Sequence, residues 1–148
     1  MFKKKISSLE KKLNYTFKDK ELLIKALTHK TYAFESMDPI EYNERLEFLG
    51  DSILNFVIAE MLHQKNLFFS EGELTRRRAI YVNNTHLAEK SKKLHIGDYL
   101  LLGKGETKQN GHQNSSNLAN TLEAIFGAIY LDSDFDTVRT IIERIVVE

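Results

Sequence analysis

Apolar residues recur along nearly the whole chain at the three- and four-residue spacing of amphipathic helices. No stretch keeps the strict alternation of apolar and polar residues that is typical of a strand. We therefore predict an all-α fold, a multi-helix domain whose 148 residues suffice for one hydrophobic core. The spacing predicts helices over residues 6–13, 20–32, 41–64, 71–82, 85–94, 118–131 and 136–147.

Capping residues support two of the predicted helix starts. Asp19 is a suitable N-cap for the helix over residues 20–32. Ser70, followed three residues later by Glu73, forms a capping box before the helix over residues 71–82. Between the helices we expect a short apolar passage over residues 97–102 and exposed loops over residues 35–39 and over the polar, mobile stretch 108–117.

The helix predicted over residues 41–64 carries three carboxylates within an otherwise apolar pattern. Glu44, Glu47 and Asp51 are spaced i, i+3 and i+7, so they share one helix face. Most positions from 46 to 62 are apolar, which predicts that protein covers much of this helix. Like charges repel, and burying them costs several kcal/mol unless a partner neutralises them. The pattern therefore suggests a bound divalent cation.

The helix predicted over residues 118–131 repeats this pattern, with Asn120 and Glu123 among apolar residues. If the two helices face each other, their oxygen ligands could enclose a cation. A site without histidine or cysteine favours Mg²⁺ or Mn²⁺ over Zn²⁺. The alternative is that each buried carboxylate is hydrogen-bonded or paired with an arginine such as Arg45. The spacing alone leaves both interpretations open.

Composition narrows the class of protein further. The chain has no cysteine, which excludes disulfides, thiolate metal ligands and a cysteine nucleophile. No run approaches eighteen apolar residues and no signal peptide is visible, so we expect a cytoplasmic protein that does not span a membrane. The 21 basic residues equal the 21 acidic ones. A net charge of zero argues weakly against a dedicated nucleic-acid binder, but it does not exclude a nuclease.

The stretch from Glu44 to Ser52, ERLEFLGDS, resembles the signature of the ribonuclease III family of double-stranded-RNA endonucleases. Shorter segments resemble further blocks of the family in the same order along the chain. They are ALTHK at residues 26–30, EGELTR at 71–76, LGKGE at 102–106 and NTLEAIFGA at 120–128. The resemblance covers essentially the whole chain and is to the bacterial catalytic domain.

This resemblance implies a function and a set of residue roles. The activity would be hydrolysis of double-stranded RNA with Mg²⁺, for which Mn²⁺ can substitute, leaving 5′-phosphate and 3′-hydroxyl ends during processing of ribosomal and messenger RNA. The protein would be a homodimer in which Phe48 packs into a socket on the partner subunit; the alternative is a Phe48 that is simply core. The implied metal-binding residues are Glu47, Asp51, Asn120 and Glu123, with Asp51 and Glu123 catalytic and Glu44 and Glu71 as supporting acids.

The chain departs from the family pattern in two respects. Asn120 occupies a metal-binding position that is normally Asp, which keeps an oxygen ligand but removes a negative charge. We expect attenuated cleavage, and the alternative is an inactive RNA-binding member of the same fold. Residues 1–148 also end where bacterial enzymes continue into a double-stranded-RNA-binding domain, so we expect a catalytic domain without that module. It is either an excised part of a longer enzyme or a naturally short member.

Basic residues outside the acidic motifs are candidate contacts to RNA. The candidates are Arg76 in the middle motif and Lys104 and Lys108 in and after the glycine-rich block. The alternative for each is a solvated charge with no ligand. A third interpretation of the whole chain is a helical interaction module whose carboxylates only form ion pairs.

Overall fold

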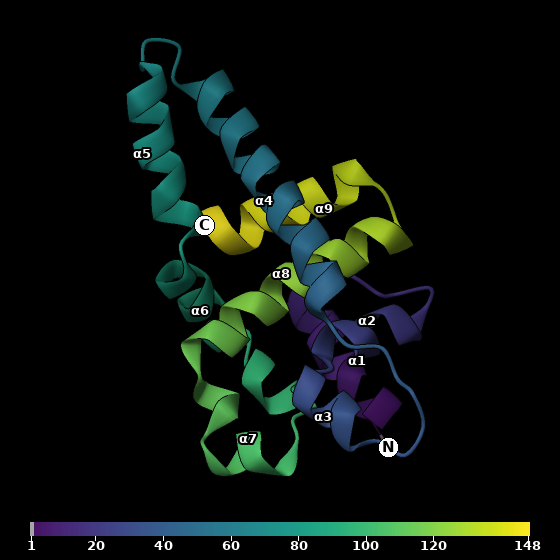
Figure 1. Cartoon of the computed structure of the whole chain (residues 1–148). Coiled ribbons are helices and arrows are strands. Elements are labelled where there is room, and N and C mark those ends of the chain that lie inside the picture. The colour runs from purple at the N-terminus through teal and green to yellow at the C-terminus, as the bar shows by residue number, and fades with distance from the viewer. Residues whose placement is uncertain (1) are drawn as a thin grey trace.

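The structure, a computed structural model, describes residues 2–148 and is built of helices, as predicted (Figure 1). Among these residues the only β pairing is an isolated bridge between Thr28 and Leu101. None of the described helices has both the length and the apolar character needed to cross a bilayer. The elements are α1 (Phe2–Leu13), α2 (Lys20–Leu27), α3 (Lys30–Glu35), α4 (Glu44–Lys65), α5 (Glu71–Val82), α6 (Asn84–Lys93), η1 (Ile96–Tyr99), α7 (Lys104–Lys108), η2 (Gly111–Gln113), α8 (Ser115–Asp132), α9 (Phe135–Ile142) and the π-helical η3 (Glu143–Val147).

Helix α8 runs through the middle of the molecule and contacts α2, α4 and α6 (Figure 1). Its residues from Leu118 to Ile129 are all buried except Asn120, which is half-buried. The strongly apolar segment predicted from the sequence is therefore the central core helix. Its apolar side chains, together with those of α2, α4 and α6, form one continuous core.

The single helix predicted over residues 20–32 is wrong, because the chain breaks between α2 and α3. Thr28 leaves the helical conformation, and its backbone forms the bridge with Leu101. The N–H of His29 donates to the Leu101 carbonyl at 3.0 Å, and the N–H of Leu101 donates to Leu27 at 2.9 Å. The partner lies more than seventy positions away, so local periodicity could not reveal the break. His29 then caps α3 by accepting from the N–H of Thr31.

The exposed loop predicted over residues 108–117 is also wrong in part. The chain forms α7, then η2, and α8 begins at Ser115, before the first apolar residue of the stretch. Polar side chains stabilise these turns: Asn114 caps α8 by accepting from the N–H of Asn117 at 2.9 Å. Asn117 in turn donates to the Glu106 carboxylate at 3.0 Å and to the Gly111 carbonyl at 3.1 Å. Apolar periodicity misses helical turns that are held by asparagine side chains.

The remaining boundaries differ from the predictions at the ends. Helix α4 begins at Glu44 rather than at residue 41, because the loop that contains Pro39 extends to Asn43. The two predicted N-caps are confirmed, since the Asp19 side chain accepts from the N–H of Glu21 and the Ser70 side chain accepts from the N–H of Glu73. The other half of the predicted capping box does not form, because the Glu73 carboxylate pairs with Arg76 and Arg77.

Candidate metal centre at the crossing of two helices

Helices α4 and α8 cross in direct backbone contact, and two glycines make this possible. A Cβ atom added at Gly50 would overlap the carbonyl oxygen of Glu123, and one added at Gly127 would overlap the carbonyl oxygen of Leu46. Any larger residue at either position would separate the helices. The contact places Glu123 against the turn of α4 that lies between Glu47 and Asp51.

The crossing brings together five of the six acidic or amide residues that the sequence singled out as ligands or supporting acids. They border one open cavity of about 570 Å³. Asn84, the first residue of α6, also borders it, and sequence reasoning missed this residue because Asn83-Asn84 reads as an ordinary helix start. The complete lining consists of Glu44, Glu47, Phe48, Asp51, Asn84, Asn120 and Glu123.

Burial and like charges distinguish these carboxylates from ordinary surface acids. Glu123 is only 6% exposed, and its burial, with Asp51 and then Glu47 beside it, raises its pKa to about 9. The pKa of Glu47 is also raised, first by burial and then by Glu44 and Asp51. A proton on Glu123 relieves part of the repulsion near neutral pH. A divalent cation would relieve it more completely by replacing that proton.

The structure contradicts the alternative in which a basic residue neutralises each of these carboxylates. Within residues 2–148, no lysine, arginine or histidine forms an ion pair with Glu44, Glu47, Asp51 or Glu123. Arg45 is exposed and forms no ion pair with them; the pKa of Glu41 is lowered mainly by its hydrogen bond and ion pair with Lys25 and to a smaller extent by the charge of Arg45.

The donor set fits a hard divalent cation in its chemistry, because it consists of carboxylate and amide oxygens only. No three carboxylate or imidazole side chains in the described part of the chain already converge as a metal site. Holding one ion therefore requires side-chain rotation, which the exposed positions of Glu44 and Asp51 permit. The half-buried Asn120 supplies a further oxygen from α8.

Other predicted site residues lie away from this cavity. Glu71 is exposed at the start of α5, beside the end of α4 that is remote from the acidic turn (Figure 1). Arg76 is exposed and pairs with Glu73, so part of its charge is compensated within the helix. Lys104 and Lys108 are exposed at the two ends of the short helix α7.

Phe48 lies at the rim of the same cavity and is 79% exposed. It is therefore not a core residue of this chain. On the same helix Phe56 is 56% exposed, so its own chain covers much of α4, as expected, but not these two positions. Exposed aromatic side chains on an otherwise packed helix are typical of a surface that is covered by a partner.

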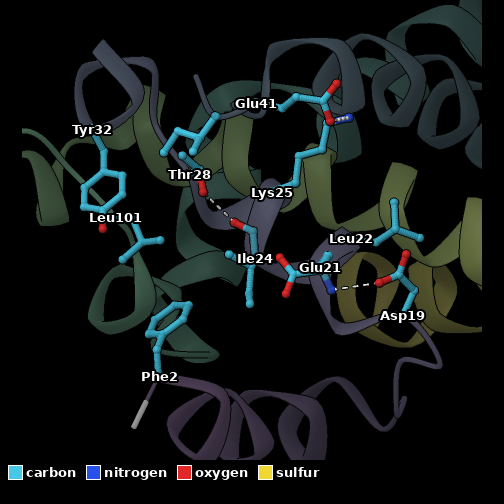
Figure 2. Close-up of a pocket in the computed structure, with 11 residues that line it drawn as sticks. Phe2, Asp19, Glu21, Leu22, Ile24, Lys25, Thr28, Tyr32, Glu41 and Leu101 are labelled. Atoms are coloured by element: carbon cyan, nitrogen blue, oxygen red, sulfur yellow. Dashed lines mark hydrogen bonds and ion pairs between the residues drawn. The ribbon is translucent and has the colours of Figure 1, made fainter. Parts of the chain in front are cut away.

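A second, more apolar cavity of about 570 Å³ lies between α1, α2 and the segment before α4 (Figure 2). Its acidic residues are individually satisfied. Asp19 accepts from the N–H of Glu21 at 3.0 Å, and Glu41 pairs with Lys25 at 2.7 Å. Because its carboxylates have partners and do not face one another, this cavity lacks the electrostatic signature of the acidic one.

The fold and the acidic cavity define an all-helical domain with an oxygen-ligand site at the crossing of its two central helices. A family model described as Ribonuclease-III-like matches residues 19–148. The chain belongs to this family, which confirms the resemblance seen in its motifs.

Curated relatives and solved structures agree with this assignment. The chain is 45% identical to "Ribonuclease 3" of Desulfotalea psychrophila over 142 residues, which are 96% of this chain and 59% of that protein. It is 49% identical to "Ribonuclease 3" of Vibrio cholerae over 137 residues, which are 93% of this chain and 58% of that protein. The chain thus spans less than two thirds of the curated relatives that it matches.

Among solved structures, the chain is similar to the nuclease domain of ribonuclease III from Campylobacter jejuni. The TM-score is 0.89 at 42% identity, with 95% of each chain covered, and that structure is described for flexibility in a region involved in dimer formation. Similarity extends to Dicer from Pichia stipitis, with a TM-score of 0.64 at 27% identity over 89% of this chain and 55% of that one.

Proposed function

We propose that this chain is the catalytic domain of a cytoplasmic endonuclease that hydrolyses double-stranded RNA, leaving 5′-phosphate and 3′-hydroxyl ends, in the processing of ribosomal and messenger RNA. The single observation that carries the proposal is the buried Glu123 facing Asp51 and Glu47, without a basic partner among residues 2–148. An arrangement of this kind is costly for stability and is typical of a site that binds a cation. The family and the nuclease-domain neighbours support the same conclusion.

The residues that would hold Mg²⁺, or Mn²⁺ in its place, are Glu47, Asp51, Asn120 and Glu123. When bound, such an ion lowers the pKa of a coordinated water and stabilises the leaving oxygen of a phosphodiester. Asp51 and Glu123 face each other across the helix crossing and would be the catalytic residues, because both would hold the ion at the reacting phosphate. Glu123 would lose its proton when the ion binds, and Glu44 would add negative charge at the rim of the cavity.

The proposed function is tested by incubating the chain with long double-stranded RNA in Mg²⁺ or Mn²⁺. We expect short duplex products with 5′-phosphate ends, and no cutting of single-stranded RNA or in the presence of a chelator. RNA that stays intact over the whole range of metal concentrations would contradict the proposal. Duplex that is bound but not cut would favour the inactive RNA-binding member, for which Asn120 is the specific observation.

Replacing Asn120 with aspartate is expected to lower the Mg²⁺ concentration needed for half-maximal cleavage several-fold, because it restores a charged ligand at the helix crossing. The measurement is a Mg²⁺ titration of cleavage rate for the chain and for the Asn120→Asp variant. Asn84→Asp is the matched control, since Asn84 borders the same cavity from α6 and is not a proposed ligand. Equal midpoints for Asn120→Asp and the unmodified chain would argue against a ligand role.

We propose further that the active form is a homodimer. Phe48 at the rim of the acidic cavity and Phe56 further along the helix leave apolar surface on α4 uncovered, which a second copy would bury. Glu71 lies at the start of α5, beside the end of α4 that is remote from the acidic turn, so we propose that it supports the site of the second copy and not that of its own chain (Figure 1). Two sites related by two-fold symmetry would each face one strand of a duplex.

We expect Phe48→Ala to weaken this dimer at least tenfold, because removing a buried aromatic anchor from an interface costs about 2 kcal/mol or more and about 1.4 kcal/mol corresponds to tenfold. Sedimentation at micromolar concentration measures the change. Phe34→Ala is the control, because Phe34 is 72% exposed but lies on α3. A chain that already sediments as a monomer, or equal effects of the two substitutions, would contradict the dimer.

A further inference from the structure

A smaller cavity of about 220 Å³ adjoins the acidic one and shares three of its lining residues, Glu44, Glu47 and Asn120. Its other wall differs in chemistry, because it is formed by residues that donate hydrogen bonds or present amide oxygens. These residues are His29, Lys30, Asn43 and Asn117. We call this space the side cavity. The wall that it shares with the acidic cavity would contact the ion, and the opposite wall is chemically suited to a different ligand.

The hydrogen bonds around His29 fix which of its ring atoms is available. Its Nδ1 accepts from the backbone N–H of Thr31 at 3.2 Å, so in the neutral ring the proton is on Nε2. His29 therefore presents an N–H donor. Its neighbour Lys30 is exposed and forms no ion pair within the described residues. Together they form a donor pair of the kind that recognises a phosphate.

The two asparagines of the side cavity differ from this donor pair, because each already donates an amide N–H to another group of the protein. Asn117 uses its amide N–H groups to donate to the Glu106 carboxylate and to the Gly111 carbonyl. Asn43 donates its amide N–H to the Ala26 carbonyl at 3.2 Å. Asn117 thus uses both of its amide N–H groups, so the group that remains is its oxygen, a fixed acceptor, whereas Asn43 keeps its oxygen and one further N–H. A fixed acceptor is unsuited to a phosphate but suited to a hydroxyl group, which can donate to it.

The side cavity therefore offers two groups that can donate to a phosphate and a fixed oxygen that can accept from a hydroxyl. It also adjoins the site proposed for phosphodiester hydrolysis. One ribonucleotide of an RNA strand carries both a phosphate and a hydroxyl group. We propose that the side cavity receives the ribonucleotide adjacent to the bond that is cut. Lys30 and His29 face its phosphate, and Asn117 accepts a hydrogen bond from its 2′-hydroxyl. This inference rests on the proposed function, and it makes Asn117 a residue that distinguishes RNA from DNA.

The test asks whether the side chain of Asn117 and one 2′-hydroxyl group of the RNA act together. Cleavage sites are mapped on a short RNA duplex, and single 2′-deoxynucleotides are then placed at each position flanking the cut bond. For the unmodified chain we expect a loss of about fivefold in kcat/KM at one flanking position, the worth of one hydrogen bond. The Asn117→Ala variant should be slower on the all-ribose duplex and insensitive to that deoxy substitution. Equal sensitivity of variant and unmodified chain would overturn the proposal.

Asn117 also binds residues of η2 and α7, so Asn117→Ala could fail to fold. A second variant tests the phosphate contact independently. Lys30→Gln changes an exposed side chain, and we expect a higher KM with unchanged kcat. The slope of log affinity against log salt concentration should decrease in magnitude by about 1, the change expected for the loss of one phosphate contact. Lys4→Gln, on the exposed face of α1, is the control and should match the unmodified chain. No difference between the two lysine variants would overturn the phosphate role.

These outcomes separate the side cavity from the proposed function. If the unmodified chain cuts RNA but no flanking deoxy substitution matters, only the side cavity is contradicted. If the chain cuts nothing, the proposed function is contradicted. The same series of deoxy substitutions, measured as duplex binding in Ca²⁺, then tests the side cavity alone. If the unmodified chain distinguishes ribose from deoxyribose at one flanking position and Asn117→Ala does not, the proposal is supported. If the unmodified chain does not bind the duplex, or does not distinguish the two sugars, the proposal is overturned.

Discussion

Replacing Gly50 with alanine is expected to destabilise the protein by about 3 kcal/mol or more, and it is expected to abolish metal binding in any fraction that folds. Alanine is intrinsically the better helix former by about 1 kcal/mol, so the whole cost is steric. The added methyl group would overlap the Glu123 carbonyl, and the backbone of α8 has no rotamer with which to move aside. Separating the helices would also draw Glu123 away from Glu47 and Asp51. Urea unfolding monitored by circular dichroism measures the loss.

The matched control is Gly72→Ala in α5. A Cβ atom at Gly72 meets nothing closer than 3.7 Å, and that neighbour is the end of the flexible Arg76 side chain. This substitution should be neutral or stabilise the protein by up to about 1 kcal/mol. If Gly50→Ala were tolerated as well as Gly72→Ala, the close crossing of α4 and α8 would not be what positions the acidic residues.

Replacing Glu123 with glutamine is expected to reduce cleavage by at least about 10²-fold, since changes in groups that only support metal ligands already reduce activity 10- to 100-fold. The variant keeps the shape of the side chain and removes the charge that the cation would meet. Single-turnover cleavage of duplex RNA at saturating Mg²⁺ measures the effect. Glu89→Gln, an exposed glutamate of α6 that does not border the cavity, should cleave at the unmodified rate.

The same variant should change how stability depends on pH in the absence of metal. Glu123 has a pKa of about 9 in the folded chain against an ordinary value of 4.5, so the folded state binds more protons over this interval. Stability therefore falls as the pH rises from about 4.5 toward about 9. Glu123→Gln lacks this dependence and should be more stable than the unmodified chain at pH 8. Urea unfolding in EDTA at several pH values checks this, and parallel curves would contradict it.

The fold class and the acidic cluster were predictable because both depend on local spacing. Helical periodicity is visible in any window of the chain, and i, i+3, i+7 spacing is sufficient to put Glu44, Glu47 and Asp51 on one face. The same pattern of polar residues in an apolar helix indicated Asn120 and Glu123, and the family resemblance implied the metal-binding role of both. The structure then brought all five residues to one cavity.

Features that depend on distant partners were not predictable. The break after Thr28 is made by Leu101, and the close approach at Gly50 is made by Glu123, each more than seventy positions away. Asn84 reaches the cavity only because α6 packs beside α8. The separation of Glu71 from the acidic cavity, by contrast, follows from the length of α4, because Glu71 comes just after the end of that helix and the acidic turn lies at its start (Figure 1).

We propose that the acidic side chains at the helix crossing are retained because they bind a divalent cation. Calorimetric titration with Mn²⁺, compared between the unmodified chain and Glu123→Gln, measures this binding. We expect saturable binding by the unmodified chain, proton release on binding near pH 8, and loss of both in the variant. Absence of binding by the unmodified chain, or equal binding by the two proteins, would contradict it.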